Sequence, residues 1–268
     1  MELKLLNERL NKKYCDFLNS CEDAFFYHTL EYKAFLQNLL SCEEEYYVAI
    51  EGGKIIGVLP LLKKNGEYGV VYNSLPYFGS YGGIISNNKL AFSNLLNKYN
   101  DLVLNSKVSS SVMIPPPFYD KSFKDEIKFN LIDERIGLRT DINAQADFKE
   151  NKIKDFHPDT RWSIRRARKN SIKVFVDNTK IDFLKDLYIE NMNNMNAKSR
   201  EKKFFSLIDK YFIPGKHYDI YVAKMDEKII SACLLFYFGK HVEYTIPVIL
   251  KEYRTHQPLS LIIYTAMC

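Results

Sequence analysis

The stretch Tyr-Val-Ala-Ile-Glu-Gly-Gly-Lys-Ile-Ile-Gly-Val-Leu-Pro-Leu at residues 47–61 decides the fold, because it recurs at residues 221–235. The second stretch reads Tyr-Val-Ala-Lys-Met-Asp-Glu-Lys-Ile-Ile-Ser-Ala-Cys-Leu-Leu, and within the first ten positions both share Tyr, Val, Ala, Lys, Ile and Ile without a gap. Each has the pattern of a strand, a tight polar turn and a second strand. The offset, 221 minus 47 or 174 residues, suits a duplicated domain and is far too long for a solenoid repeat.

Composition indicates a globular protein that can hold one large or two ordinary domains. The chain has 268 residues, 46% of them hydrophobic and 26% charged. The first residues lack the apolar run of a signal peptide, and no segment approaches the length of a membrane span. The five cysteines are scattered, without C-x-x-C or a zinc-like spacing to histidine. We therefore expect a cytoplasmic protein with free thiols, no membrane span and no metal site; the oligomeric state is left open.

Positive charge is concentrated in one region of the chain. Residues 149–173 carry nine Lys or Arg against three acidic residues, a local charge of +6. Because the whole chain carries +5, the remainder is close to −1. A basic segment on a near-neutral body indicates a site for an anion rather than a generally cationic surface.

Periodicity predicts the same order of elements twice. The first copy is expected to contain helices at 3–17, 29–40 and 90–104, the hairpin at 46–62, strands at 68–72 and 109–114, and further strands within 129–142. The second is expected to contain helices at 160–169, 181–194, 202–212 and from about Gln257, and strands at 172–176, 218–225, 228–238 and 241–249. Thr29 is the expected N-cap of its helix, and Asp159 or Thr160 that of the helix at 160–169. This order predicts an α/β fold with mixed sheets, divided into domains 1–145 and 146–268.

The second copy is expected to be incomplete at its C-terminal end. About 85 residues follow the hairpin before the boundary at 145, but only 33 follow it in the second copy. Either the chain is a fragment or the second copy has lost its last strands.

The densest chemical feature is the arginine-rich helix expected at 160–169. At about 100° per residue, Arg161, Arg165 and Arg168 fall within a stripe of about 60°. Guanidinium groups in a row offer paired donors that match phosphate or carboxylate oxygens. A solvated helix face is the alternative, and the use of arginine rather than lysine favours an anionic ligand.

A second candidate is the glycine-rich stretch at residues 79–83, which contains Tyr81 and Gly82. Its backbone N–H groups could approach a phosphate or a substrate amide, and Tyr81 could line a pocket. It matches no phosphate-loop pattern, and a simple turn beside an aromatic core explains it as well.

No catalytic triad, metalloprotease motif or pair of carboxylates is recognisable, so the catalytic residues are not identified. The histidines at 157, 217, 241 and 256 are isolated and read as structural or surface residues. Any chemistry is expected to rest on positioning and on stabilising charge.

Taken in order, these motifs resemble those of the Fem-type (FemABX-like) aminoacyltransferases and of the related GNAT acyltransferases. The resemblance rests on the repeated hairpin, on Leu-Pro-Leu and Tyr-Gly-Gly in the first half, and on the arginine helix. Arg161-x-x-Ile164-Arg165-x-Ala167 followed by Ile172-x-Val174 is similar to the family's Arg-x-x-Ile-x-x-Ala…Val-x-Val. Glu243-Tyr244 through Leu261-Ile262 resembles the strand-to-helix passage of a second GNAT copy.

The resemblance implies two tandem GNAT-like domains that transfer an acyl or aminoacyl group to an amine. It implies that Arg161 or Arg165 grips the diphosphate of a peptidoglycan precursor, and it adds Tyr244 to the substrate-binding residues. The donor would be aminoacyl-tRNA, or acyl-CoA or an acyl carrier, without a tightly bound cofactor. The acceptor would be a small-molecule or lipid-linked, phosphate-bearing substrate.

Two departures keep other functions open. The sequence Arg-Thr-His-Gln-Pro-Leu at 254–259 lacks the glycines of a CoA-binding loop, and Pro258 lacks a backbone donor. The expected truncation removes late strands of the second copy. The first expectation is an aminoacyl- or acyltransferase acting on a peptidoglycan-type precursor. The alternatives are a CoA- or carrier-protein-dependent N-acyltransferase acting on an amino sugar or peptide, and a non-enzymatic anion or nucleic-acid-binding protein.

Overall fold

The computed structural model describes residues 1–75, 77–78, 81–105, 107–115, 129–133, 137–142, 153–154 and 156–268. The chain divides into two units, Met1–Gly137 and Leu138–Cys268. The domain boundary expected near 145 falls within residues 143–152, outside the described residues, and stays a prediction.

Unit 1 begins with a strand, not with a helix. The elements at its start are β1 (Glu2–Leu5), the 3₁₀ helix η1 (Glu8–Leu10), α1 (Asn11–Ser20), the 3₁₀ helix η2 (Phe26–His28) and α2 (Leu30–Leu40). The helix expected from residue 3 was therefore wrong at its first turns. The reason is tertiary, because β1 pairs antiparallel with β3 (Tyr47–Glu51), and sheet pairing overrides a local helical pattern. α2 begins as predicted, since Thr29 Oγ1 accepts the N–H of Tyr32.

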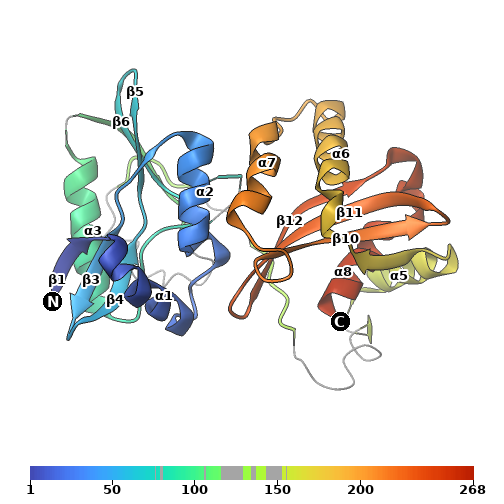
Figure 1. Ribbon diagram of the computed structural model, residues 1–268, viewed down its shortest axis with the longest axis horizontal. Helices are drawn as coiled ribbons and strands as arrows, with labels where there is room; N and C mark the ends of the chain where they lie inside the picture. The colour runs from blue at the N-terminus through green and yellow to red at the C-terminus, as the bar shows by residue number, and fades with distance from the viewer. Residues whose placement is uncertain are drawn as a thin grey trace. The chain divides into compact units, whose positions relative to one another are not determined.

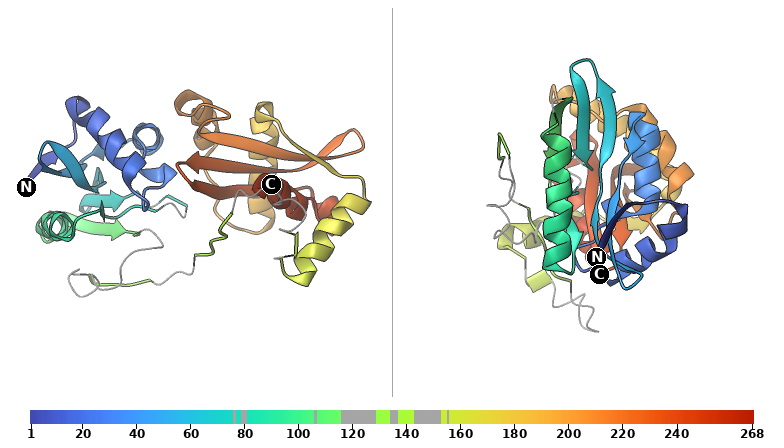
Figure 2. Two further views of the ribbon diagram at one scale, coloured as in Figure 1. Left: turned by 90° about the horizontal axis from the view of Figure 1, so that it is seen from below. Right: turned by 90° about the vertical axis from the view of Figure 1, so that its left-hand side faces the viewer.

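The rest of unit 1 is built around the first hairpin. After β2 (Glu43–Glu44) and β3 come β4 (Lys54–Leu59), β5 (Leu62–Gly66), β6 (Gly69–Ser74), β7 (Ile85–Ser86), α3 (Lys89–Val103) and β8 (Val108–Met113). Two four-stranded sheets result, in the orders β1-β3-β4-β7 and β2-β5-β6-β8. β6 and β8 are parallel, and α3 lies between them in the chain. The right-hand view of Figure 2 shows α3 on one side of these strands and α1 and α2 on the other.

Unit 2 consists of one antiparallel sheet between two pairs of helices. Its elements are α5 (Pro158–Lys169), β9 (Lys173–Val176), the 3₁₀ helix η4 (Asn178–Lys180), α6 (Ile181–Asn194), α7 (Lys202–Tyr211), β10 (Tyr218–Met225), β11 (Lys228–Phe238), β12 (His241–Ile249), the 3₁₀ helix η5 (Lys251–His256) and α8 (Pro258–Met267). The strand order is β12-β11-β10-β9. Figure 1 shows α6 and α7 on one side of this sheet and α5 and α8 on the other.

The core under α5 and α8 explains why α5 forms. Ile164 and Ala167, three residues apart, both lie fully buried against Ile262 of α8 and Cys233 of the sheet. The remaining residues of α5 are polar or exposed, and they include Trp162, which is apolar but exposed. The helix thus has one narrow apolar side and a wide polar side.

The first hairpin contains a β-bulge. Ala49 pairs with Gly57, but Ile50 pairs with Ile55, so Ile56 is an extra residue on β4. The turn at Gly52 and Gly53 has the positive φ angles, 56° and 76°, that glycine adopts without strain.

The second hairpin contains the same bulge at the same place. Ala223 pairs with Ser231 and Lys224 with Ile229, which leaves Ile230 as the extra residue on β11. Ile56 and Ile230 are 174 positions apart, the offset of the sequence repeat. The two hairpins therefore correspond in register as well as in sequence.

Two further expectations were wrong. The described residues within 129–142 form no strand, and Leu131 and Leu138 are 85% and 97% exposed, without the burial that a sheet would give them. α5 is capped by His157, whose ring nitrogen accepts the N–H of Asp159, and Pro158 occupies the first helical position. The cap is therefore neither Asp159 nor Thr160.

Candidate functional site

The arginines of α5 do not act as one stripe. Arg168 lies with its guanidinium 4.9 Å from the centre of the Tyr264 ring on α8, and Tyr264 is buried. This cation–π contact ties Arg168 to the neighbouring helix. Arg161 is half-buried and Arg165 is exposed, and neither side chain makes an ion pair or hydrogen bond to another described residue. Two of the three expected anion-binding arginines are thus available to a ligand, while the third packs on Tyr264.

Arg166, which the stripe leaves out, has a structural role. Its Nε donates to the carbonyl oxygen of Thr255 in η5 at 2.6 Å, and its guanidinium lies 5.1 Å from the Trp162 ring centre. Arg166 therefore holds α5 against η5. The separation in sequence between residues 166 and 255 hides this contact from any local pattern.

The start of α8 adds a second region suited to an anion. Gln257 precedes the helix with a φ of 62° and no side-chain cap, and Pro258 occupies its first position. The unsatisfied N–H groups and the dipole at a helix start favour negative charge. Arg254 and His256 lie in the last turn of η5, directly before this helix. Pro258 contributes no N–H, so fewer donors are present than at an ordinary helix start.

Tyr244 lies beside a bulge on the edge strand β12. Leu234 pairs with Ile246 and Leu235 with Tyr244, so Thr245 is the extra residue, and its Oγ1 donates to the carbonyl oxygen of Leu234 at 2.8 Å. Bulges of this kind re-aim side chains and are frequent beside active sites. The Tyr244 side chain is 48% exposed, and partial desolvation, with a smaller effect of the Cys233 thiol, raises the pKa of its hydroxyl. Tyr244 is therefore a phenol that keeps its proton and can donate it in a hydrogen bond.

Gly82 of unit 1 has a packing role in the structure. Its N–H donates to the carbonyl oxygen of Ile114 at 2.7 Å, and a Cβ built on it would lie 1.8 Å from the carbonyl oxygen of Ser74. Gly83 donates its N–H to the hydroxyl oxygen of Ser74. These amides are already paired within the unit, so the expected contact of the Gly82 N–H with a substrate is not available. Residues 79 and 80 of the same stretch lie outside the described residues.

Tyr81 belongs to an aromatic cluster. Its ring centre lies 5.4 Å from that of Phe25 and 6.0 Å from that of Tyr27, and its side chain is half-buried. Both partners come from the segment before α2. Tyr81 can present one edge to a ligand while the rest of its ring packs, so its place in a substrate pocket stays a prediction.

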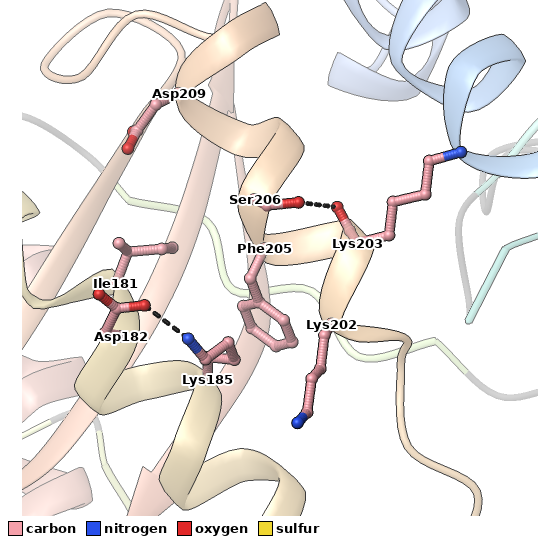
Figure 3. Close-up of a pocket in the computed structure, with 8 residues that line it drawn as sticks. All are labelled: Ile181, Asp182, Lys185, Lys202, Lys203, Phe205, Ser206 and Asp209. Carbon is pink, nitrogen blue, oxygen red and sulfur yellow. Dashed lines mark hydrogen bonds and ion pairs between the residues drawn. The ribbon is translucent and has the colours of Figure 1, made fainter.

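A small pocket lies between α6 and α7 (Figure 3), with a volume of about 270 Å³. Among the charged residues that line it, Lys185 Nζ lies 2.5 Å from Asp182 Oδ1, and Asp209 accepts the hydroxyl of Tyr218. Phe205 lies between the two helices in Figure 3. Lys202 and Lys203 also line the pocket, so it has three lysines and two aspartates in its wall.

Four of the five cysteines are not activated as nucleophiles. All five are unpaired, and burial raises the pKa values of the thiols of Cys15, Cys21, Cys42 and Cys233. Within the described residues, no group of three His, Cys, Asp or Glu side chains could hold a metal ion. Nor does any helix among those residues have the length and apolarity needed to cross a membrane.

No protein-family model matches the sequence, and neither does any curated protein. Solved structures are similar in fold. A structure of FemX covers 100% of this chain and 85% of its own, with a TM-score of 0.73 and 14% identity. A conserved protein of unknown function from Bacteroides thetaiotaomicron covers 100% and 86%, with a TM-score of 0.58 and 11% identity. The C-terminal domain of a candidate lysylphosphatidylglycerol synthetase from Agrobacterium fabrum covers 98% and 75%, with a TM-score of 0.54 and 12% identity.

At these identities the likeness is one of fold, and it extends over the whole chain. It confirms the α/β class and the duplication that the repeated hairpin predicted, while among the three sheets of the described residues only β2-β5-β6-β8 contains a parallel pair and is mixed. The chain therefore has the FemABX-like fold, in which two GNAT-like units follow each other in tandem.

Proposed function

We propose that the protein is an acyl- or aminoacyltransferase that forms an amide on an amine of a phosphate-bearing, peptidoglycan-type precursor. The observation that carries this proposal is the agreement in fold with FemX along the full length of the chain. A fold alone hosts many functions, so the proposal also needs a site. The available arginines of α5 supply one.

Arg161 and Arg165 are the residues assigned to the precursor's phosphates. They lie four positions apart on α5, so their side chains leave the helix on the same side. Their guanidinium groups donate to no described residue and can form paired hydrogen bonds with phosphate oxygens. Arg168 is assigned only to holding α8, because Tyr264 occupies it.

The proposed reaction needs no covalent enzyme intermediate. The acceptor amine attacks the carbonyl carbon of the donor ester or thioester, the new C–N bond forms, and the bond to the oxygen or sulfur of the donor breaks. The amine loses a proton, and the departing oxygen or sulfur gains one. The Tyr244 phenol, whose raised pKa keeps it protonated even in alkaline solution, is assigned to donate a hydrogen bond to the donor carbonyl or the departing atom.

The donor in this proposal is aminoacyl-tRNA, and the protein works in the cytoplasm on a soluble or lipid-linked acceptor. The local charge of +6 at residues 149–173 is compatible with both the phosphates of the precursor and those of the donor.

Thermal unfolding in the presence of a UDP-linked muropeptide tests the proposal. The ligand is expected to raise the unfolding temperature of the wild-type protein and to have little effect on Arg161→Ala and Arg165→Ala. Lys240→Ala removes an exposed charge from the turn between β11 and β12 and is the matched control, which should respond like the wild type. No stabilisation of the wild type, or equal stabilisation of all four proteins, contradicts the proposal.

A second candidate is a CoA- or carrier-protein-dependent N-acyltransferase. The uncapped start of α8, next to Arg254 and His256, favours it, because such a helix start binds the phosphates of a nucleotide. Pro258 opposes it by removing one donor. Stabilisation by CoA but not by the muropeptide, lost in Arg254→Ala, would select this candidate. Salt-sensitive binding to nucleic acid without binding to either ligand would select the non-enzymatic alternative.

A further inference from the structure

The polar side of α5 surrounds the only tryptophan of the chain with cations. Trp162 is 54% exposed. With Arg161 taken as zero, about 100° per residue places Arg165 at about 40°, Lys169 at about 80°, Trp162 at about 100° and Arg166 at about 140°. We name these five residues the Trp162 face. Ile164 and Ala167 lie on the opposite side of the helix, buried against α8 and the sheet.

The indole is held in its exposed position. The Arg166 guanidinium lies 5.1 Å from the ring centre, and the Arg166 Nε donates to the carbonyl oxygen of Thr255 at 2.6 Å. The hydrogen bond to Thr255 fixes the guanidinium to η5, so the indole rests on an anchored cation. An isolated surface tryptophan requires no explanation, but one that is held among four cations on one side of a helix does.

Three cations of the Trp162 face have no acidic partner among the residues that the structure describes. Arg161, Arg165 and Lys169 make no ion pair with a described residue. The one carboxylate of α5, Asp159, lies in the first turn with its Oδ2 3.4 Å from the Nδ1 of His157. The face therefore carries four positive charges around an indole that is half in water.

We propose that the Trp162 face docks the protein on the surface of an anionic lipid bilayer. Tryptophan prefers the level of the lipid head groups, where its ring is buried and its N–H stays in a polar layer. Each Arg or Lys close to an anionic surface strengthens binding about fivefold. Charge complementarity thus favours anionic head groups over an uncharged surface.

The same features predict how the protein docks. The apolar side of α5 is occupied by α8, so only one indole enters the lipid, and the helix does not sink into the acyl chains. Binding is consequently reversible and sensitive to salt, because it depends mainly on exposed charges. No membrane-spanning helix is needed.

Nucleic acid is the competing partner, because bases also stack on tryptophan. Nucleic acid is disfavoured here because the basic segment is short. The cations lie on the twelve residues of α5, a length of about 18 Å, and one contact surface of the indole is already occupied by Arg166. A strand-binding protein needs a longer basic track with several aromatic platforms.

Docking on lipid goes beyond the proposed function and can stand without it. Arg161 and Arg165 belong to both, whereas Trp162 belongs only to docking. The two proposals are therefore separable by one residue.

Because the chain has one tryptophan, its fluorescence reports directly on the proposed contact. The experiment adds vesicles of phosphatidylglycerol with phosphatidylcholine, or of phosphatidylcholine alone, to the full chain. The emission of Trp162 is expected to shift to shorter wavelength, and to be quenched by brominated acyl chains, with the anionic vesicles only. Added salt, at roughly 0.5 M, should reverse the shift because it screens the exposed charges.

Variants measured by vesicle flotation complete the test. Arg165→Gln should weaken partitioning about fivefold and Arg165→Gln with Lys169→Gln about twenty-five-fold, in line with the gain per charge. Trp162→Ala should also float less, while unfolding at the wild-type temperature. The control is Lys202→Gln with Lys203→Gln, which removes two charges from α7 and should float like the wild type.

Several results would overturn the docking proposal. They are a Trp162 emission that anionic vesicles leave unchanged, equal binding to neutral vesicles, equal losses in the α7 control, or a response to a single-stranded oligonucleotide without one to vesicles. The muropeptide experiment without lipid reads the proposed function separately. Vesicle binding by a protein that the muropeptide does not stabilise would remove the proposed function and leave docking in place.

Discussion

The two hairpins of the chain, β3–β4 and β10–β11, share a bulge but lead into different strands and helix starts. Ile56 and Ile230 are the extra residues, and Ala49 and Ala223 lie fully buried beside them. Ala49 packs in the core under α3, and Ala223 in the core under α8. The shared part of the repeat is therefore the part that carries a helix on its face.

Beyond the hairpin the two units differ in structure. In unit 1, Pro60 ends β4, and β5 continues in a different sheet, whereas β11 of unit 2 runs unbroken for 11 residues. At the 174-residue offset, Pro60 and Leu61 correspond to Leu234 and Leu235, which face the second bulge at Thr245. Both units thus interrupt regular pairing at the equivalent position of the repeat. Unit 1 does so with a proline and unit 2 with an inserted residue in the neighbouring strand.

The helices after the two hairpins also differ at their first turns. Asn88 caps α3, because its Oδ1 accepts the N–H of Ala91 at 3.0 Å. α8 has no side-chain cap. The comparison teaches that duplication preserved the hairpin and its helix, while of these two helices only α8 has the uncapped start that suits an anion.

The largest effect is expected from Gly82→Ala in unit 1. The new Cβ would meet the carbonyl oxygen of Ser74 at 1.8 Å, so the end of β6 must move, at a cost of at least about 3 kcal/mol. Hydrogen exchange should show faster exchange in β6 and β8. Gly52→Ala is the control, because its φ of 56° is strained but its Cβ meets nothing within 4 Å, and about 1 kcal/mol is expected. Equal costs for the two variants would contradict the packing role of Gly82.

The bulged isoleucines should differ in importance. Ile230 is fully buried, and Ile230→Ala is expected to lower the free energy of unfolding by about 2–5 kcal/mol. Ile56 is only partly buried, so Ile56→Ala should cost less than half as much. Urea unfolding followed by circular dichroism measures both. A larger cost at Ile56 would show that the bulge supports unit 1 more than unit 2.

Acid should weaken unit 1 more than unit 2. His28 is fully buried, and desolvation lowers its pKa from 6.5 to about 4, although a backbone hydrogen bond with Phe25 acts in the opposite direction. The folded state then binds fewer protons than the unfolded state, so the stabilisation is complete above pH 6.5 and is lost as the pH falls towards 4. About 3 kcal/mol is involved. No histidine is buried among the described residues of unit 2.

His28→Asn tests the origin of this pH dependence. The Asn side chain can still accept the Phe25 N–H but does not titrate, so stability should become nearly flat between pH 6.5 and 4. Urea unfolding at several pH values provides the measurement, with hydrogen exchange in residues 25–36 to localise the change. A wild-type slope that persists in His28→Asn would assign the effect to other groups.

The smallest effects concern the two helix starts. Asn88→Ala should destabilise by about 1 kcal/mol through loss of the cap of α3. Gln257→Gly should stabilise by up to about 1 kcal/mol, because glycine relieves the left-handed backbone before α8. Thermal unfolding distinguishes a loss from a gain. Two losses of similar size would mean that Gln257 contributes a contact that offsets its strain.

Strong local patterns predicted most of unit 2. α6, β10, β11 and β12 have the bounds expected from periodicity, since each combines a clear period with turn residues at both ends. β1 was missed because its partner strand lies more than 40 residues away. The bulges were not foreseen either, because an inserted residue leaves the composition of a strand unchanged.

The candidate site was only partly predictable. Arg161 and Arg165 lie on the helix as expected, and Tyr244 was included through the family resemblance alone. The contact of Arg168 with Tyr264, that of Arg166 with Thr255, and the internal pairing of the Gly82 N–H all depend on residues that are distant in sequence. A helical wheel gives the direction of a side chain but not its neighbour.

The bulge shared by both hairpins also limits how the chain can evolve. Removing Ile56 or Ile230 alone would leave the pairs on both sides of the bulge unchanged and join them into a regular ladder, so the local bend of that strand would be lost. Removing a paired residue of these strands would instead shift the pairing by one position and turn the later side chains to the opposite face, so substitutions are tolerated there more readily than deletions. The number of residues in each strand is therefore more tightly constrained than their identity.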